Sequence, residues 1–273
     1  MKIKNAIEKY LEWKMETSET AGYSYSSFIR CFGNYFEEKS LTEITTKDVS
    51  SFITLFSKSK SNRSTRYLAT ILKDFYKFYN NVINPHLIRS PRLILDDARV
   101  MSVEEFNTID DLLDENNYYE LRAKLIHNLL WSTGIRLNEL CRIELGQINL
   151  VQRMMTIVSE KSYKKAYIMW SEKSHKLLVK YLGVRVVENN SPQLLGISAR
   201  QVERIVKWIS ERAGVKGIHP HSYRHGKAHY MINNGATIDE VAFVLRHENP
   251  MLTKRMYLRL NEHEMGKIMN KYI

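Results

Sequence analysis

The most constraining stretch of this sequence is His219-Pro220-His221-Ser222-Tyr223-Arg224-His225, which is followed by Leu245-Arg246-His247 and by Tyr257. Histidine exchanges protons near neutral pH, and arginine stabilises negative charge that develops on an oxygen atom. A tyrosine hydroxyl adds a nucleophile. Together these residue types predict chemistry on a phosphodiester. The sequence contains no glycine-rich phosphate loop or cysteine cluster that indicates a competing site.

The bulk composition agrees with a nucleic-acid partner. The 273 residues suffice for one large or two modest domains, and 44% hydrophobic with 26% charged residues is ordinary for a globular protein. The formal charge of +11 favours a polyanion. Cys31 and Cys141 cannot form a disulfide framework, which predicts a reducing, cytoplasmic location. Neither a membrane span nor a signal peptide is expected.

Residues 1–84 have the apolar spacing that is typical of helices. The expected helices cover residues 3–15, 23–36, 46–56 and 62–81. Thr46 is predicted to cap the third helix. The stripe expected to face the core in the fourth helix is Tyr67, Ile71, Phe75 and Phe78.

A basic segment, residues 57–66, lies between the third and fourth helices. Its cations are Lys58, Lys60, Arg63 and Arg66, and it contains no acidic residue. These cations and the neighbouring hydroxyl groups can bind DNA phosphates, although a solvated loop is an equally open interpretation. Two prolines then predict a linker over residues 85–100.

A second, mainly helical domain is expected over residues 101–273, opened by the capping box Ser102–Glu105. Strands are expected at 154–158 and 166–169, with a basic turn between them. The expected helices cover residues 102–115, 118–132, 136–143, 172–182, 198–213, 221–233, 237–246, 252–260 and a tail at 262–271.

Thr133-Gly-Ile-Arg136-Leu-Asn-Glu139-Leu140 contains a second candidate for phosphate binding. Gly134 permits a tight turn, after which Arg136 begins a helix and can direct its planar guanidinium at a phosphate. Glu139 shares its face and could hold the arginine. An exposed i,i+3 ion pair is the alternative interpretation.

His221 and Arg224 are three residues apart at a predicted helix start and therefore share a face. His225 and His229 continue the series. A zinc-binding histidine stripe is one alternative, and hydrogen-bonded core histidines are another. Tyr257, taken alone, could equally be a packed aromatic residue on a late helix.

Together these segments resemble the tyrosine recombinases, the family of phage integrases and Xer-like site-specific recombinases. Residues 133–140 resemble the family's first arginine box, and His221-Ser-Tyr-Arg224-His225 its HxxRH box. Leu245-Arg-His247 resembles the LGH box and Tyr257 the nucleophile. Lys161 stands where the family has its hairpin lysine, with Lys164 and Lys165 nearby.

Two features depart from the family pattern. Arg246 stands where glycine is usual, and the spacing from His247 to Tyr257 is one residue longer than usual. These departures leave open a DNA-binding, architectural relative that no longer cuts. A topoisomerase of type IB that relaxes DNA is a further alternative with the same chemistry.

The resemblance implies a mainly α fold with a small β-hairpin, made of a helical, SAM-like core-binding domain (1–84), a linker and a catalytic domain (101–273). It implies strand cleavage and rejoining through a 3′-phosphotyrosyl intermediate, without metal or other cofactor. Arg136, Arg224 and His247 would bind the phosphate, Lys161 would protonate the leaving oxygen, and His221 would assist Tyr257. Glu139 and His225 would support them.

The implied partner is double-stranded DNA with a short inverted repeat, bound by a tetramer that is a monomer or dimer when free. The implied location is cytoplasmic and nucleoid-associated. The tail, residues 262–273, would dock on a neighbouring protomer or pack on its own domain.

Overall fold

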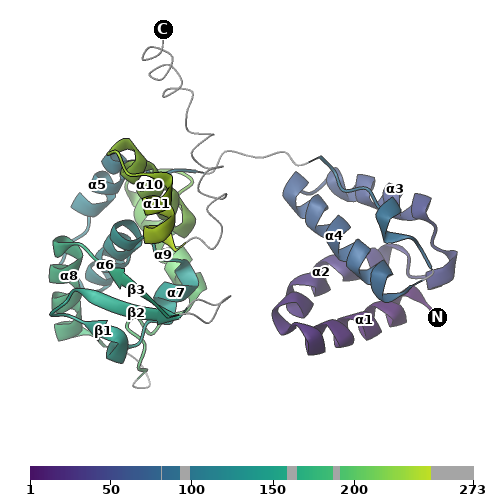
Figure 1. The fold of residues 1–273 in the computed structure, drawn as a ribbon, viewed down its shortest axis with the longest axis horizontal. Coiled ribbons are helices and arrows are strands. Elements are labelled where there is room, and N and C mark those ends of the chain that lie inside the picture. The colour runs from purple at the N-terminus through teal and green to yellow at the C-terminus, as the bar shows by residue number, and fades with distance from the viewer. Residues whose placement is uncertain (81, 93–98, 159–164, 187–190, 247–273) are drawn as a thin grey trace, which may run out of the picture. The chain divides into compact units, whose positions relative to one another are not determined.

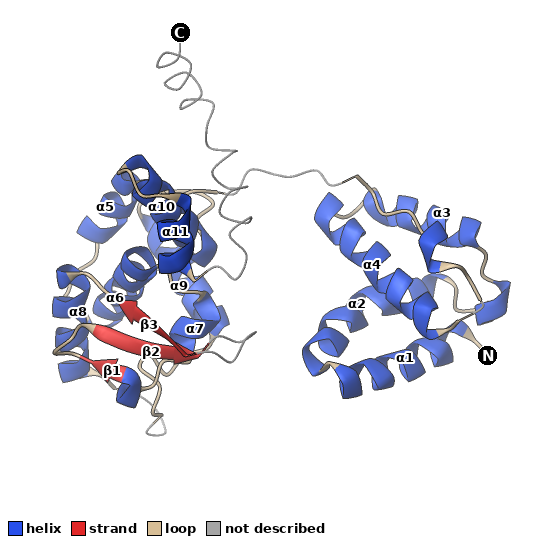
Figure 2. Ribbon diagram, in the orientation of Figure 1, coloured by secondary structure: helices blue, strands red, loops and turns tan. Residues whose placement is uncertain are grey.

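The computed structural model describes residues 1–80, 82–92, 99–158, 165–186 and 191–246. The chain divides into two compact units, Met1–Asp96 and Asp97–Ile273. Helices make up most of both units, and one small sheet belongs to the second (Figures 1 and 2). The predicted mainly α fold with a small β element is therefore confirmed. Within the described residues, no helix has the length and apolar character needed to cross a membrane.

The described part of the first unit contains four helices and two short 3-10 turns. The helices are α1 (Ile3–Thr17), α2 (Glu19–Tyr35), α3 (Thr46–Ser57) and α4 (Asn62–Phe78), and the turns are Leu41–Glu43 and Pro85–Leu87. All four predicted helices are present, with ends shifted by a few residues. The cap of α3 is Thr45 rather than Thr46: Asp48 donates its backbone N–H to Thr45 Oγ1 (3.2 Å), and its carboxylate accepts the Thr45 N–H (2.9 Å).

The core of the first unit is rich in aromatic side chains, and it corrects the predicted stripe on α4. Ile71 and Phe75 are fully buried, but Tyr67 and Phe78 are only half-buried. Leu68, Leu72 and Tyr76 complete the buried face. The face is wider than the predicted stripe because α4 packs against α1, α2 and α3.

Part of the predicted linker packs against α4. Ile88 is buried in the first core, Lys73 Nζ donates to Ser90 Oγ (3.3 Å), and Arg66 donates to the carbonyl of Pro91. Arg66 is thus already engaged with its own chain.

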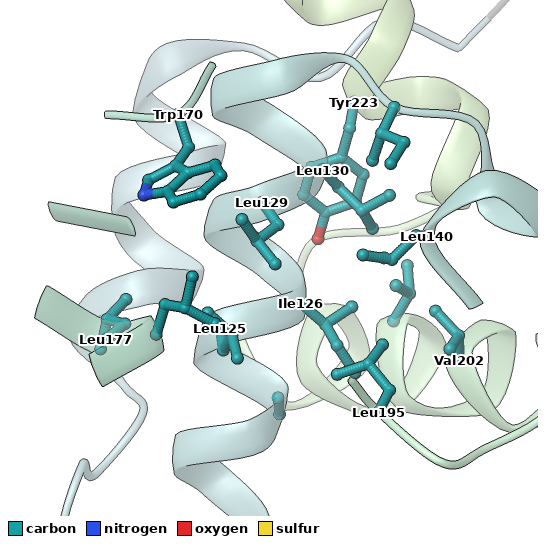
Figure 3. Packing of buried hydrophobic residues seen from close by; sticks show 14 of the residues in the cluster. Leu125, Ile126, Leu129, Leu130, Leu140, Trp170, Leu177, Leu195, Val202 and Tyr223 are labelled. Carbon is teal, nitrogen blue, oxygen red and sulfur yellow. The ribbon is translucent and has the colours of Figure 1, made fainter. Parts of the chain in front are cut away.

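The second unit is arranged around α6 (Tyr118–Thr133), which contacts α5, α8, α9 and α10. Its side chains are buried on nearly all sides, with Leu125, Ile126, Leu129 and Leu130 in the core shown in Figure 3. A helix that is buried on nearly all sides is expected at the centre of a domain. The surrounding helices are α5 (Val103–Asp111), α7 (Leu137–Cys141), α8 (Glu172–Val184), α9 (Ala199–Arg212), α10 (Pro220–Asn233) and α11 (Ile238–Leu245).

An antiparallel sheet with strand order β1-β2-β3 lies against this core. Strands β2 (Met154–Val158) and β3 (Lys165–Met169) match the prediction, with Met155 opposite Ile168 and both buried. Strand β1 (Ile148–Asn149) was not predicted, because two residues carry no recognisable alternation.

Gly226 allows the segment that enters the second unit to cross α10 closely. A Cβ atom at this position would collide with the carbonyl oxygen of Met101 and lie 2.8 Å from a ring carbon of Trp131. Met101 is buried and donates its N–H to the Ser222 carbonyl (3.2 Å). The backbone contact therefore fixes α10, which carries His221 and Arg224, against the rest of the unit.

We expect Gly226→Ala to destabilise the protein by about 1–3 kcal/mol through overpacking, although alanine normally favours a helix by ~1 kcal/mol over glycine. Gly183→Ala in α8 is the matched control, since no atom lies within 4 Å of its added Cβ. Urea unfolding of both variants measures the effect. Equal stability changes for the two would contradict the close backbone contact.

Candidate active site

The site is built around the turn that ends α6. Gly134 has the left-handed conformation (φ 58°), which caps the helix, and a Cβ there would collide with the Leu245 side chain of α11. The turn delivers Arg136 to the N-terminus of α7. Two segments that are far apart in sequence, 133–136 and 245–246, are thereby held together.

Arg136 is bound to Glu139 through both its backbone and its side chain. The Arg136 N–H donates to Glu139 Oε2 (3.0 Å), and Nη1 donates to Oε1 (2.8 Å). The Glu139 side chain is 3% exposed and that of Arg136 is 35% exposed. The alternative of an exposed surface pair is therefore wrong, because the carboxylate is buried.

Arg224 is a buried guanidinium on α10 that is held by carbonyl oxygens. Nη1 donates to the Gly134 carbonyl (2.6 Å) and Nη2 donates to the Leu245 carbonyl. Burial lowers the pKa of Arg224 to about 9, and the positive charges of Arg136 and Arg246 act in the same direction. Positive charge therefore exceeds negative charge around Arg224, as expected of a site that binds an anion.

His221 stands one turn before Arg224 on α10. Although its surface reaches solvent, burial of the ring lowers its pKa, and the charges of His219, Arg224 and Arg136 add to that effect. The imidazole is therefore neutral at pH 7, which is the form that accepts a proton. Sequence reasoning missed His219, whose Nδ1 caps α10 by accepting the Ser222 N–H (3.2 Å).

His225 and His229 are less buried than the prediction of core residues implied, since both are half-buried. Within the described residues, His225 Nδ1 has no hydrogen-bond partner, and burial lowers the His225 pKa to about 4. His229 is hydrogen-bonded as predicted, because its Nδ1 accepts from Asn233 Nδ2 (3.3 Å). The rings of His221 and His225 are 6.4 Å apart, and no group of three potential metal ligands occurs in the described part of the chain.

Arg246 joins this cluster, which its sequence position alone did not reveal. Its Nη2 donates to Glu139 Oε2 (3.2 Å), and its carbonyl accepts from Arg136 Nη2 (3.2 Å). Burial would raise the pKa of Glu139, but the Arg136 hydrogen bonds and the charges of Arg246 and Arg136 outweigh burial and lower it.

The structure thus brings together four predicted residues, Arg136, Glu139, His221 and Arg224, with His225 beside them. Three further predicted residues, Lys161, His247 and Tyr257, lie outside the described residues. Lys165 begins β3 and is exposed.

Comparison with known proteins places these residues in a family. The model of the phage integrase family matches residues 99–264, which is more than half of the chain. The chain therefore belongs to the phage integrase family. This confirms the resemblance to Xer-like tyrosine recombinases.

Individual relatives agree with this assignment. The tyrosine recombinase XerC of Corynebacterium glutamicum is 30% identical over 190 residues, covering 67% of this chain and 61% of the relative. XerC of Staphylococcus epidermidis is 27% identical over 98% of this chain and 95% of its own length.

Solved structures of low identity share the fold. XerH recombinase bound to palindromic difH substrate has a TM-score of 0.76 at 15% identity, covering 97% of this chain and 84% of that chain. A lambda integrase dimer bound to a COC' core site has a TM-score of 0.75 at 14% identity, covering 94% and 95%.

The buried carboxylate predicts an acid-sensitive site. Because the pKa of Glu139 is lowered below its ordinary value of 4.5, its ionised form stabilises the folded state above that pH. This contribution is lost as pH falls through the folded-state pKa. We expect Glu139→Gln to lower the unfolding free energy at pH 7 by about 3–5 kcal/mol. The variant should also lose less of that free energy as the pH falls from 7 into the acidic range. Glu203→Gln, which alters an exposed carboxylate on α9, is the control. If the unfolding free energy of Glu139→Gln fell with acid as steeply as that of the unaltered protein, the lowered pKa of Glu139 would be contradicted.

Proposed function

We propose that this protein is a site-specific DNA recombinase that cuts and rejoins strands through a 3′-phosphotyrosyl intermediate. The observation that supports the proposal most strongly is the pair of guanidinium groups, Arg136 and Arg224, held by backbone carbonyls beside the neutral His221. Family membership supplies the reaction class. Neither metal nor ATP enters the proposed reaction.

In this mechanism the Tyr257 hydroxyl oxygen attacks the phosphorus atom and the bond to the 5′-oxygen breaks. His221, being neutral, takes the tyrosine proton, and Lys161 gives a proton to the leaving 5′-oxygen. His247 donates a third hydrogen bond to the phosphate. Attack by the 5′-hydroxyl of another strand reverses these steps and completes the exchange.

The two arginines supply electrostatic stabilisation. The pentacoordinate phosphorus places extra negative charge on its nonbridging oxygens, and guanidinium groups donate to them in a planar, bidentate manner. Arg136 and Arg224 are oriented before DNA arrives, so the transition state gains their charge without reorganising the protein. Glu139 and His225 support this arrangement.

The proposed partner is double-stranded DNA carrying a short inverted repeat, bound by a tetramer in the cytoplasm at the nucleoid. XerH was solved with palindromic difH substrate, and lambda integrase as a tetramer on a Holliday junction. Residues 1–84 would form the core-binding domain, residues 85–100 the linker and residues 101–273 the catalytic domain. The tail, residues 262–273, would dock on a neighbouring protomer.

We expect Tyr257→Phe to abolish covalent adducts while DNA binding persists, because only the nucleophilic oxygen is lost. The substrate is a duplex isolated from a randomised pool by binding to the protein and then nicked near its centre. Adducts are measured on a denaturing gel. Tyr230→Phe, on the exposed surface of α10, is the matched control. Adducts formed by Tyr257→Phe would contradict the assignment of the nucleophile.

Arg224→Ala should slow adduct formation by a factor of about 10²–10³, the usual loss for one oxyanion donor.

The same nicked duplex distinguishes the proposed recombinase from the two alternative functions. Binding without any adduct in the unaltered protein would indicate an architectural relative. Relaxation of supercoiled DNA that lacks a paired site would indicate a topoisomerase.

The basic segment, residues 57–66, runs from the end of α3 into the first turns of α4 and gives a separate prediction for binding. Lys58, Lys60 and Arg63 are exposed, and removing a cation that binds one phosphate should reduce the slope of log K against log salt by about 0.9. Alanine variants titrated with duplex DNA at several salt concentrations measure this slope. Lys4→Ala is the control, because Lys4 is ion-paired with Glu37 (2.6 Å). An unchanged slope in all three variants would show that these cations are solvated and bind no DNA phosphate.

A further inference from the structure

Arg246 has the left-handed backbone conformation, which residues other than glycine rarely adopt. It ends α11 with φ 54° and ψ 49°, and in the described residues Arg153 is the other non-glycine residue with positive φ. A side chain in the left-handed region crowds its own carbonyl oxygen. Glycine would form the same cap without that strain.

The Arg246 side chain turns inward instead of extending into solvent. It is 14% exposed and contacts Glu139 Oε2 through Nη2, while Nη1 donates to the Val244 carbonyl (3.1 Å). Within the described residues, its buried Nε atom has no hydrogen-bond partner. An arginine in this position has given up most of its hydration, and Glu139 is the carboxylate that compensates it among the residues described.

Glu139 is consequently shared by two arginines. Arg136 Nη1 binds Oε1, while Arg246 binds Oε2, which also accepts the Arg136 backbone N–H. Arg136, Arg224 and Glu139 together carry a net charge of +1, and Arg246 raises the net charge to +2. Each added positive charge in a poorly hydrated site strengthens its attraction for a phosphate.

We propose that Arg246 is a positioning residue of the active site, which neutralises Glu139 and so leaves the Arg136 guanidinium more strongly directed at the DNA phosphate. The proposal rests on the proposed function, because it concerns the same phosphate. Arg246 acts through Glu139, and Arg136 makes the contact with the substrate.

Arg246→Gly has two opposed effects on stability. It relieves the strain of the left-handed backbone, and it removes one of the two guanidinium partners of the buried Glu139 carboxylate. Arg136 still pairs with that carboxylate in the variant. Urea unfolding therefore accompanies each rate measurement, and rates are compared where both proteins are folded, so that a lower rate reports on the site and not on a loss of folded protein.

The first experiment measures adduct formation in a single turnover at saturating nicked duplex. Arg246→Gly should reduce the rate about 10- to 100-fold, the range expected when a catalytic group is slightly misplaced. Arg246→Lys, which retains a positive charge, should recover part of the loss. A rate within twofold of the unaltered protein for Arg246→Gly would overturn the proposal.

Arg153→Gly is the matched control. Arg153 has the same left-handed backbone (φ 50°) and an ion pair with Glu172, but it lies beside β2, and both partners are substantially exposed. This variant makes the same change of residue and relieves the same kind of strain. Its adduct rate should match that of the unaltered protein, and an equal loss in both variants would overturn the proposal.

A second variant tests the route through Glu139. In a Glu139→Gln background, Arg246→Gly should change the rate several-fold less than in the unaltered background, because the carboxylate that Arg246 neutralises is gone and only the direct effect of its charge remains. Such coupling is the signature of two residues that act together. A loss as large as in the unaltered background would show that Arg246 does not act through Glu139.

Inorganic phosphate provides a probe that depends on neither Tyr257 nor the target sequence. Phosphate should raise the melting temperature of the protein by binding the folded state, with at least severalfold weaker apparent affinity in Arg246→Gly. Equal affinities would overturn the added-charge argument. The unaltered protein could form no adducts and still bind phosphate more tightly than Arg246→Gly. That result would contradict the proposed function but not the argument about the charge of Arg246.

Discussion

The site in the second unit depends on one constraint, which is that more positive than negative charge is buried there. The guanidinium groups of Arg136, Arg224 and Arg246 gather at one place, where the buried carboxylate of Glu139 binds two of them. Backbone carbonyls supply much of the remaining compensation. Those of Gly134 and Leu245 accept from Arg224, and that of Arg246 accepts from Arg136.

These carbonyls are available because two helices end at this point. The last carbonyls of a helix have no partner within it and carry partial negative charge, so they are natural ligands for cations. The left-handed residues Gly134 and Arg246 terminate α6 and α11 and bring the two ends together. The collision that a Cβ at Gly134 would make with Leu245 shows how close that approach is.

Such a site is costly for the free protein and useful for a reaction on phosphate. Burial lowers the pKa of Arg224 to about 9, and the positive charges of Arg136 and Arg246 add to that effect. A phosphate oxygen offsets this positive charge, and the transition state, with more negative charge, offsets it further. The close approach of these positive charges is thus consistent with catalysis by preorganised charge.

The sequence predicted the elements well where local chemistry defines them. The capping box at Ser102 and the strand from Met154 to Val158 were found at their observed positions. The burial of Glu139 could not be predicted, because it depends on Arg246 from a segment more than a hundred residues away. Arg246 was noticed only as a departure from a pattern. Its inward orientation results from tertiary packing, which leaves no periodic signal.

The hydrogen bonds that hold α10 in place respond to pH differently from the active site itself. His127, on α6, shares a 2.7 Å hydrogen bond between Nδ1 and the hydroxyl of Tyr223, the residue that precedes Arg224. Burial lowers the pKa of His127 to about 4 and raises that of Tyr223. His127 Nε2 bonds to the Phe106 carbonyl (3.0 Å), so Nε2 donates and Nδ1 accepts the tyrosine proton. Neither group changes its charge near neutral pH. The platform that holds α10 therefore keeps its hydrogen bonds, while His221 on the same helix remains available for proton transfer.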